Sequence, residues 1–216
     1  IQEFSGYRLR LIIVKKILLC ILVFVAAGYF VVMETETGQD LFLDRLLSVM
    51  TQNQQTAPVD GLDVVVCGAS SPLSTTGNAQ SCVFVIAGDR SFVVDTGPGS
   101  PRVIRRLGLP LNNLEAVLLT HFHGDHISAL GDVNFNSWVA GRGKKLTVMG
   151  PEGVDLVVNG FNQAYSLDSS YRTRHHGWDI LPLEYSVMQS KTIEAGLVFE
   201  EDGLSIRAFR VDHSPI

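Results

Sequence analysis

The sequence predicts an α/β (α+β) domain, a sandwich of helices and strands that follows an apolar helix at the N-terminus. Three observations carry this prediction. Short runs rich in β-branched residues recur beyond residue 61, and segments with apolar residues at helical spacing lie between them. Strands in pairs with helices interspersed indicate helices packed on sheets. An uncharged apolar run lies near the N-terminus, and the 216 residues, 46% of them hydrophobic, suffice for one domain with a sizeable core.

The N-terminal run from Ile17 to Met33 carries no charge and approaches the roughly 20 apolar residues that cross a bilayer. Charged residues flank it asymmetrically, with basic residues before it and acidic residues after it: Arg8, Arg10, Lys15 and Lys16, then Glu34, Glu36 and Asp40. This asymmetry predicts a membrane anchor with a cytoplasmic start and with the rest of the chain on the periplasmic side. A cleaved signal peptide is the alternative, with Val25–Ala27 as its cleavage site. The apolar run continues past that site, which favours an uncleaved anchor.

A polar segment from Glu34 to Asp60 separates the anchor from the rest. It ends in a Gln- and Thr-rich stretch with a proline, which is typical of a linker, and a short amphipathic helix is expected around Leu41–Met50. We therefore divide the chain into three parts: residues 1–33, the cytoplasmic start and anchor; residues 34–60, the linker; and residues 61–216, the domain that carries the strand and helix signals.

The first part of the domain shows alternating strand and helix signals. "LDVVVCG", residues 62–68, predicts a strand, and residues 81–97 contain two more runs separated by "AGDR", the pattern of an antiparallel hairpin. Residues 100–110 have apolar side chains at helical spacing and close with glycine and proline, so they predict a helix. An apolar strand from Ala116 to Leu119 then runs directly into a cluster of histidines.

The second part continues this pattern. "KKLTVMGPEG", residues 144–153, predicts a strand and a turn that opens a helix over Glu152–Phe161. "LVFEEDGLSIRAFRVDHS", residues 197–214, predicts a hairpin that turns at Glu201–Gly203. Between these elements lies the polar stretch Tyr165–Asp179, which we interpret as a loop.

The chain has three cysteines, too few for a disulfide framework. Cys20 lies in the apolar run, whereas Cys67 and Cys82 lie on predicted neighbouring strands. Two interpretations of the second pair stay open. The cysteines form a single bridge, or they are two small buried hydrophobic residues.

The segment "THFHGDH", residues 120–126, holds three of the chain's six histidines and an aspartate. Alternate residues of an extended segment point the same way, so His121, His123 and Asp125 can converge where the strand ends. Gly124 allows the bend, and His126 faces another direction. Imidazole and carboxylate together suit Zn²⁺, and the lack of cysteine argues against a purely structural site. The cluster therefore predicts a catalytic metal whose bound water has a pKa of about 7, which is the chemistry of hydrolysis by metal-bound hydroxide.

The same residues resemble a known family. "THFHGDH" resembles the HxHxDH signature of the metallo-β-lactamase fold superfamily. "VVVCGASSPLSTTGNAQSCVFV" followed by "FVVDTGPGSPRVIRRLGL" is similar in order and spacing to the opening of its ribonuclease Z and secreted arylsulfatase branch. The resemblance covers Leu62–Ile216. It implies an αββα sandwich with two divalent metal ions, usually zinc, at one edge.

The resemblance also implies roles for individual residues. By position, it assigns His121, His123 and His213 as ligands of the first metal. It assigns Asp125 and His126 as ligands of the second metal. Asp125 would also orient the nucleophile, and Asp95 would support the ligands by hydrogen bonding. The family pattern requires a bridging aspartate and a last histidine after His213, whereas the chain begins with Ile and stops at Ile216. We therefore expect a fragment whose sandwich is incomplete at the C-terminus and which is inactive alone.

The stretch Tyr165–Asp179 is where this branch often carries an insertion that reaches the substrate. Arg172 and Arg174 would then hold an anionic ester, and His175 or His176 would lie beside it, with His176 as the candidate proton donor to the leaving group. The alternative is an ordinary solvated loop with no role in catalysis.

The leading hypothesis is a membrane-anchored periplasmic hydrolase that splits a phosphate, sulfate or other small anionic ester. The alternatives are a ribonuclease Z-like phosphodiesterase acting on RNA and a non-catalytic metal-binding member of the fold. The net charge of -5 argues mildly against nucleic acid as a partner without excluding a local basic patch. The predicted location outside the cytoplasm also argues against RNA as the substrate, because tRNA precursors are cytoplasmic. The sequence leaves the oligomeric state open, with a homodimer as one option.

Overall fold

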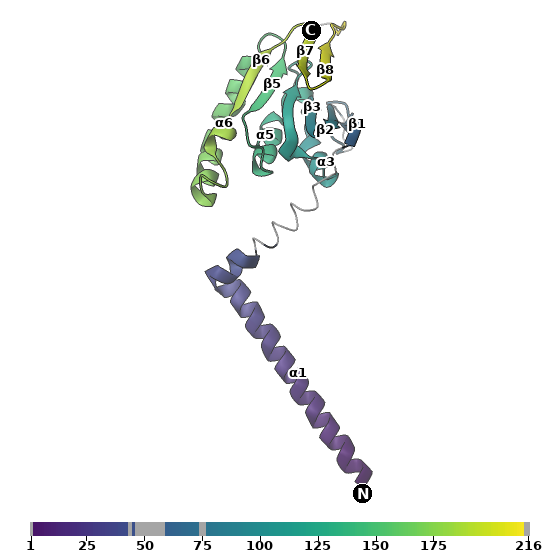
Figure 1. The fold of residues 1–216 in the computed structure, drawn as a ribbon, viewed down its shortest axis with the longest axis vertical. Helices are drawn as coiled ribbons and strands as arrows, with labels where there is room; N and C mark the ends of the chain where they lie inside the picture. Colours follow the sequence, from purple (N-terminus) through teal and green to yellow (C-terminus); the bar gives the residue numbers. More distant parts are fainter. Residues whose placement is uncertain (1, 43–44, 46–58, 74–76, 214–216) are drawn as a thin grey trace. The chain divides into compact units, whose positions relative to one another are not determined.

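The computed structural model describes residues 2–42, 45, 59–73 and 77–213. The chain divides into two compact units, Ile1–Asn53 and Gln54–Ile216, and each is described by itself. Figure 1 shows their elements.

The first unit is dominated by α1 (Gln2–Glu34), a helix of 33 residues. Its stretch Val14–Val31 is long and apolar enough to cross a membrane, and none of that stretch is buried. A signal sequence near the N-terminus has the same properties, so this observation does not separate the two. After α1, the Thr35 hydroxyl accepts a hydrogen bond from the Gly38 backbone N–H (3.1 Å), as at a helix N-cap, and residues 36–42 are helical. Most of the helix expected around Leu41–Met50 lies outside the described residues.

The second unit is built on a six-stranded sheet in which the strands follow one another in chain order. The strands are β1 (Val59–Gly68), β2 (Cys82–Gly88), β3 (Arg90–Val94), β4 (Leu114–Leu118), β5 (Leu146–Gly150) and β6 (Met188–Thr192). β1, β2 and β3 pair antiparallel, and a tight turn joins β2 to β3. β3, β4, β5 and β6 pair parallel, because a helical crossover separates each from the next.

The crossovers contain α3 (Ser100–Arg106), the 3₁₀ turn η1 (Leu111–Asn113), α4 (Gly124–Ile127), α5 (Leu130–Val139), α6 (Val154–His176) and the 3₁₀ turn η2 (Leu183–Tyr185). The antiparallel pair β7 (Gly196–Glu201) and β8 (Leu204–Ala208) forms a separate small sheet.

Adjacent residues of each central strand point to opposite faces of the sheet. Val93, Val117 and Val148 join the core formed with the helices, whose buried members include Ile104, Leu130, Val133, Val154 and Val158. Their neighbours Phe92, Ala116 and Met149 form a second core with hairpin residues Phe199, Leu204 and Ile206. The described residues thus make a helix layer, a central sheet and a hairpin layer, which confirms the predicted α/β class.

Arg90, the first residue of β3, fastens the hairpin to the central sheet. Its guanidinium donates to Glu201 (2.9 Å) and Asp202 (2.6 Å) at the hairpin turn, and it lies over the Phe199 ring. Because the segment with His213 follows β8, the seating of the hairpin determines where that histidine lies.

The structure corrects the interpretation of Tyr165–Asp179 as a loop. The helix predicted over Glu152–Phe161 continues to His176, and Gly177, with a φ of 98°, ends it. Polar pairs along the helix support this extension, including the ion pair of Arg172 with Asp168 one turn earlier (2.9 Å). The sequence signal was weak because this half of the helix has few buried apolar residues.

The two cysteines of the second unit form a disulfide between the end of β1 and the start of β2. Cys67 and Cys82 are both buried, and their Cα atoms lie 5.0 Å apart. Of the two interpretations left open above, the structure therefore supports a single bridge between Cys67 and Cys82. A cross-link over a sequence separation of 15 stabilises the fold by about 3 kcal/mol in the chain-entropy account.

Replacing Gly131 by Ala should destabilise the domain, because a Cβ at this position on α5 would collide with the Tyr165 ring on α6. The Tyr165 hydroxyl donates to Asp132 (2.6 Å), so the ring is not free to move away. We expect a loss of roughly 1–3 kcal/mol in the free energy of unfolding, measured by urea denaturation. Gly143→Ala, which meets no atom within 4 Å, is the matched control and should change stability by less than about 0.5 kcal/mol. Equal effects of the two substitutions would contradict close packing of α5 on α6.

Candidate metal centre

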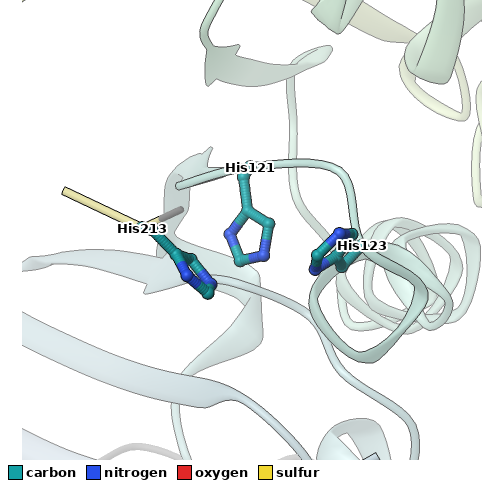
Figure 2. Close-up of side chains that lie close together, drawn as sticks. All are labelled: His121, His123 and His213. Atoms are coloured by element: carbon teal, nitrogen blue, oxygen red, sulfur yellow. The ribbon is translucent and has the colours of Figure 1, made fainter. Parts of the chain in front are cut away.

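The histidine loop lies at the edge of the sheet where the parallel strands end. Asp95 follows β3, Thr120–His126 follow β4, and Gly153 follows β5. Carboxyl ends of parallel strands meet at one edge of a sheet, which brings these loops together. Figure 2 shows the resulting cluster of imidazoles.

The structure brings His121, His123 and His213 together. One ring nitrogen from each residue lies within 4.8 Å of the others. The ring centroids of His121 are 4.7 Å from His123 and 5.0 Å from His213, and Figure 2 shows His121 between the other two. Within the described part of the chain, these are the ligand atoms that meet as a group of three.

An orphaned nitrogen shows that this arrangement fits a metal. His121 Nε2 is buried and has no hydrogen-bond partner, while Nδ1 of the same ring lies 3.1 Å from the Thr120 hydroxyl. A buried polar atom without a partner costs about 1–3 kcal/mol, so something is expected to pair with it. Three imidazole nitrogens are a donor set of catalytic zinc sites, which keep a fourth position open for water. The residues present therefore fit a zinc ion.

The electrostatic surroundings keep His121 in the form that binds metals. Burial lowers the pKa of His121, and the nearby imidazoles of His126 and His123 lower it further, against an opposing effect of the Asp95 carboxylate. A lowered pKa leaves the ring neutral at physiological pH. Only the neutral imidazole has a lone pair for a metal.

Phe122 sets the direction of the two loop histidines. Its ring packs against the helix-side core and lies 3.4 Å from the position that a Cβ would occupy on Gly153. Since alternate residues of an extended segment point to opposite sides, anchoring Phe122 inward turns His121 and His123 toward the site. Gly153 has a φ of 96°, a backbone conformation that favours glycine in the turn beside this ring.

Asp95 connects the end of β3 to the histidine loop. Its carboxylate is buried and accepts hydrogen bonds from the Thr120 backbone N–H (2.9 Å) and hydroxyl (2.9 and 3.1 Å). It also lies 2.8 Å from His126 Nδ1. Asp95 has a φ of 58°, a left-handed conformation that costs about 1–3 kcal/mol for a residue other than glycine. The carboxylate holds the Nδ1–H of His126 and leaves Nε2 for a ligand.

Asp125 and His126 form a pair beside the three histidines. The His126 ring lies 4.0 Å from the His121 ring, and its Nε2 is 3.5 Å from Asp125 Oδ2 and 3.2 Å from the Ser81 hydroxyl. Sequence reasoning did not single out Ser81 or Thr120. Thr120 stands next to the motif and could have been found, whereas nothing in the sequence pattern indicates that the segment before β2 reaches His126.

The structure does not bring the α6 candidates to this site. α6 begins beside Phe122, and its 23 residues span about 34 Å, so its last turn lies far along the sheet from the histidines. This last turn holds the predicted substrate and proton-transfer residues: Arg172, Arg174, His175 and His176. Arg172 pairs with Asp168 and lies over the Phe135 ring. The roles expected for these residues depended on a loop that folds back to the metal, and a continuous helix prevents that return.

Comparisons with known proteins identify relatives of this domain. Residues 75–181 match the sequence profile of the Metallo-beta-lactamase superfamily. The chain is 35% identical over 158 residues to a ribonuclease Z of Mycobacterium bovis (strain BCG / Pasteur 1173P2), covering 72% of this chain and 55% of the relative. It is 34% identical to a ribonuclease Z of Mycolicibacterium gilvum, covering 72% and 54%. The chain thus spans about half the length of the curated relatives it matches.

A solved structure shares the fold. The short form of human tRNase Z superposes with a TM-score of 0.52 at 18% sequence identity, covering 69% of this chain and 59% of that protein. This likeness concerns the fold alone.

Zinc should raise the melting temperature of the full chain at about pH 7.5, because the three imidazoles are brought together to bind an ion in the folded state and not in the unfolded one. His121→Ala should abolish the shift. His175→Ala, at the exposed end of α6, should keep it and serves as the control. The measurement is a thermal melt with and without zinc, and an undiminished zinc shift in His121→Ala would exclude the proposed ligand set.

The metal-free protein should lose stability as the pH falls below about 6.5. Below that pH, the unfolded His121 takes up a proton that the folded ring resists because of its lowered pKa. The unfolded state therefore binds more protons, and stability falls toward acid. Above that range both states are neutral, so His121 contributes no pH dependence. A series of melts from about pH 7.5 to 5 checks this, and His121→Ala should show a shallower slope.

Proposed function

Because residues 75–181 of this chain belong to the metallo-β-lactamase superfamily, we propose that the protein is a metal-dependent phosphodiesterase of the ribonuclease Z type that acts on RNA. The observation that carries this proposal is the three-histidine group, placed on a fold shared with ribonuclease Z relatives. These relatives favour a phosphodiester substrate over the small ester favoured by the sequence alone.

His121, His123 and His213 would hold one divalent ion, and the Asp125 and His126 pair would contribute to a second. Zinc bound there would supply a Lewis acid and a water of lowered pKa. The chain's own groups fix the surroundings of that water. Asp95 holds His126 in one ring orientation through Nδ1. The Asp125 carboxylate lies 3.5 Å from His126 Nε2, and we propose that it would accept a proton and orient the nucleophile.

The location that we propose is the membrane, with the second unit on the periplasmic side. Three observations support it: the apolar stretch Val14–Val31, the basic residues before it with acidic residues after it, and the disulfide between Cys67 and Cys82. Structural disulfides persist in oxidising compartments and are rare in the cytoplasm. The substrate would then be RNA outside the cytoplasm.

The same disulfide favours a second candidate function, the hydrolysis of a small phosphate or sulfate ester. A hydrolase in an oxidising compartment meets small esters more readily than precursor RNA. Metal chemistry is common to both candidates, so only the substrate separates them.

The zinc-loaded whole protein that carries this chain should cleave a labelled RNA oligonucleotide and bis(p-nitrophenyl) phosphate but not p-nitrophenyl sulfate. Asp125→Ala should lower kcat on both phosphodiesters by about 10²–10⁴-fold while the zinc-induced melting shift is retained. Asp179→Ala, an exposed carboxylate after α6, is the control and should be fully active. Turnover of the sulfate without cleavage of RNA would favour the second candidate, and turnover that survives chelation would exclude both.

Alkaline phosphatase fused after Asp60 should be active in a bacterial host, because that enzyme needs the oxidising periplasm. Replacing the four basic residues before the apolar stretch by glutamate should reduce the activity, since basic residues determine orientation. The matched control is a fusion to β-galactosidase at the same residue, which should behave in the opposite way. High β-galactosidase activity with inactive phosphatase would place the second unit in the cytoplasm.

A further inference from the structure

The ring nitrogens of the histidine loop differ in whether another group of the chain already binds them. Among the described residues, His121 Nε2 is buried without a hydrogen-bond partner, whereas His126 Nε2 lies 3.2 Å from the Ser81 hydroxyl. His121 belongs to the three-histidine group that Figure 2 shows. The His126 ring lies beside it, with ring centroids 4.0 Å apart. An ion at the three-histidine group thus meets a free nitrogen, and an ion at His126 meets an occupied one.

Ser81 is the donor in its hydrogen bond with His126. The Asp95 carboxylate lies 2.8 Å from His126 Nδ1 and accepts the hydrogen bond of that nitrogen, so the lone pair of the neutral ring is on Nε2. Asp125 Oδ2 is a second acceptor, 3.5 Å from the same nitrogen. Two acceptors that face one point suit a cation, and the Ser81 proton takes the lone pair of one of them.

The backbone of Ser81 is held firmly in this place. The next residue, Cys82, is buried and is joined by the disulfide to Cys67 at the end of β1. On the other side, the Ser81 carbonyl accepts a hydrogen bond from the Gly97 N–H (2.9 Å), and a Cβ on Gly97 would lie 2.7 Å from the Ser81 nitrogen. The hydroxyl can therefore leave His126 by rotation of its own side chain, without a movement of the backbone.

We propose that Ser81 controls the order in which the metal centre takes up its ions. Its hydroxyl closes His126 Nε2, so the three-histidine group loads first, and an ion beside Asp125 binds His126 only by displacing Ser81. This inference rests on the metal centre of the proposed function. Asp95 already fixes the His126 ring through Nδ1, so the ring does not need Ser81 for its orientation. The net effect of Ser81 on the second ion is therefore competition.

The size of this competition follows from what is exchanged. Because the backbone stays in place, binding of the second ion breaks one hydrogen bond between two neutral groups. The net worth of such a bond corresponds to a factor of roughly 2 to 10 in a binding constant. Removing the hydroxyl should strengthen binding of the second ion by this factor, whereas a hydroxyl that supported the centre would have the opposite effect when it is removed.

A calorimetric titration of the metal-free full chain with zinc tests the proposal. The wild-type chain should bind zinc in a strong and a weak step. Ser81→Ala should tighten the weak step by roughly 2- to 10-fold and leave the strong step unchanged. Ser81→Thr, which keeps a hydroxyl, should retain the wild-type gap between the two steps. Ser71→Ala is the matched control, because its hydroxyl lies in the same connection between β1 and β2 and accepts a hydrogen bond from the Leu73 N–H (3.4 Å).

Nuclear magnetic resonance of the metal-free chain checks the premise without any ion. Long-range correlations between ring protons and ring nitrogens report which nitrogen of His126 carries the proton and whether the other accepts a hydrogen bond. The proton should be on Nδ1 in both the wild type and Ser81→Ala. The Nε2 signal should move toward that of a nitrogen without a donor in Ser81→Ala and stay in place in Ser71→Ala.

The results separate this inference from the metal centre on which it rests. A weak zinc step that is unchanged or weaker in Ser81→Ala would overturn the role of Ser81 while leaving the three-histidine group intact. The same holds for a single zinc step in both proteins, and for an Nε2 signal that ignores the loss of the hydroxyl. Loss of the strong step in every variant, including the wild type, would instead reject the metal centre and this inference with it.

Discussion

The buried carboxylate of Asp95 is the contact on which the candidate site depends. It joins the end of β3 to the loop after β4 by accepting hydrogen bonds from Thr120 and by holding His126 Nδ1 at 2.8 Å. The backbone of Asp95 adopts a left-handed conformation to reach these partners. Strain of this kind persists only where the surroundings impose it, and here a parallel sheet imposes it by bringing the carboxyl ends of two strands to one edge. The loop that Asp95 fixes and the inward-facing ring of Phe122 then determine where the histidine side chains point.

This organisation separates two parts of the site. His121 and His123 come from one loop, and His213 arrives from a segment that follows the hairpin β7–β8. The hairpin is seated by its own apolar residues and by the ion pairs of Arg90. Candidate ligands from segments so far apart in sequence come together only when both sheets are in place, which would couple metal binding to completion of the fold.

The parts that could be predicted from the sequence are those with strong local signals. The motif around His121 and the β-branched runs of β1 to β5 have short-range patterns, and the alternation of Phe92 and Val93 between two cores follows directly from strand geometry. The contact of Ser81 with His126 depends on tertiary packing across 45 positions and leaves no local trace. The second half of α6 was interpreted as a loop because polar pairs, rather than a buried apolar face, support the helix there. Arg142 is 2% exposed and donates to Asn134 Oδ1 and Tyr185 O, although an arginine is ordinarily expected at the surface.

Strand β6 was also missed, because "MQSKT" has one buried residue and four exposed polar ones. The same polarity has a consequence for how copies of this protein meet. β6 is an edge of the central sheet, and an edge strand offers unpaired backbone groups to any other extended chain. Lys191 on this strand donates to the Val198 carbonyl (2.8 Å), and a charged, apolar-poor edge is a poor template for strand-by-strand growth. The edge is therefore a poor site for two copies of the domain to join their sheets into one.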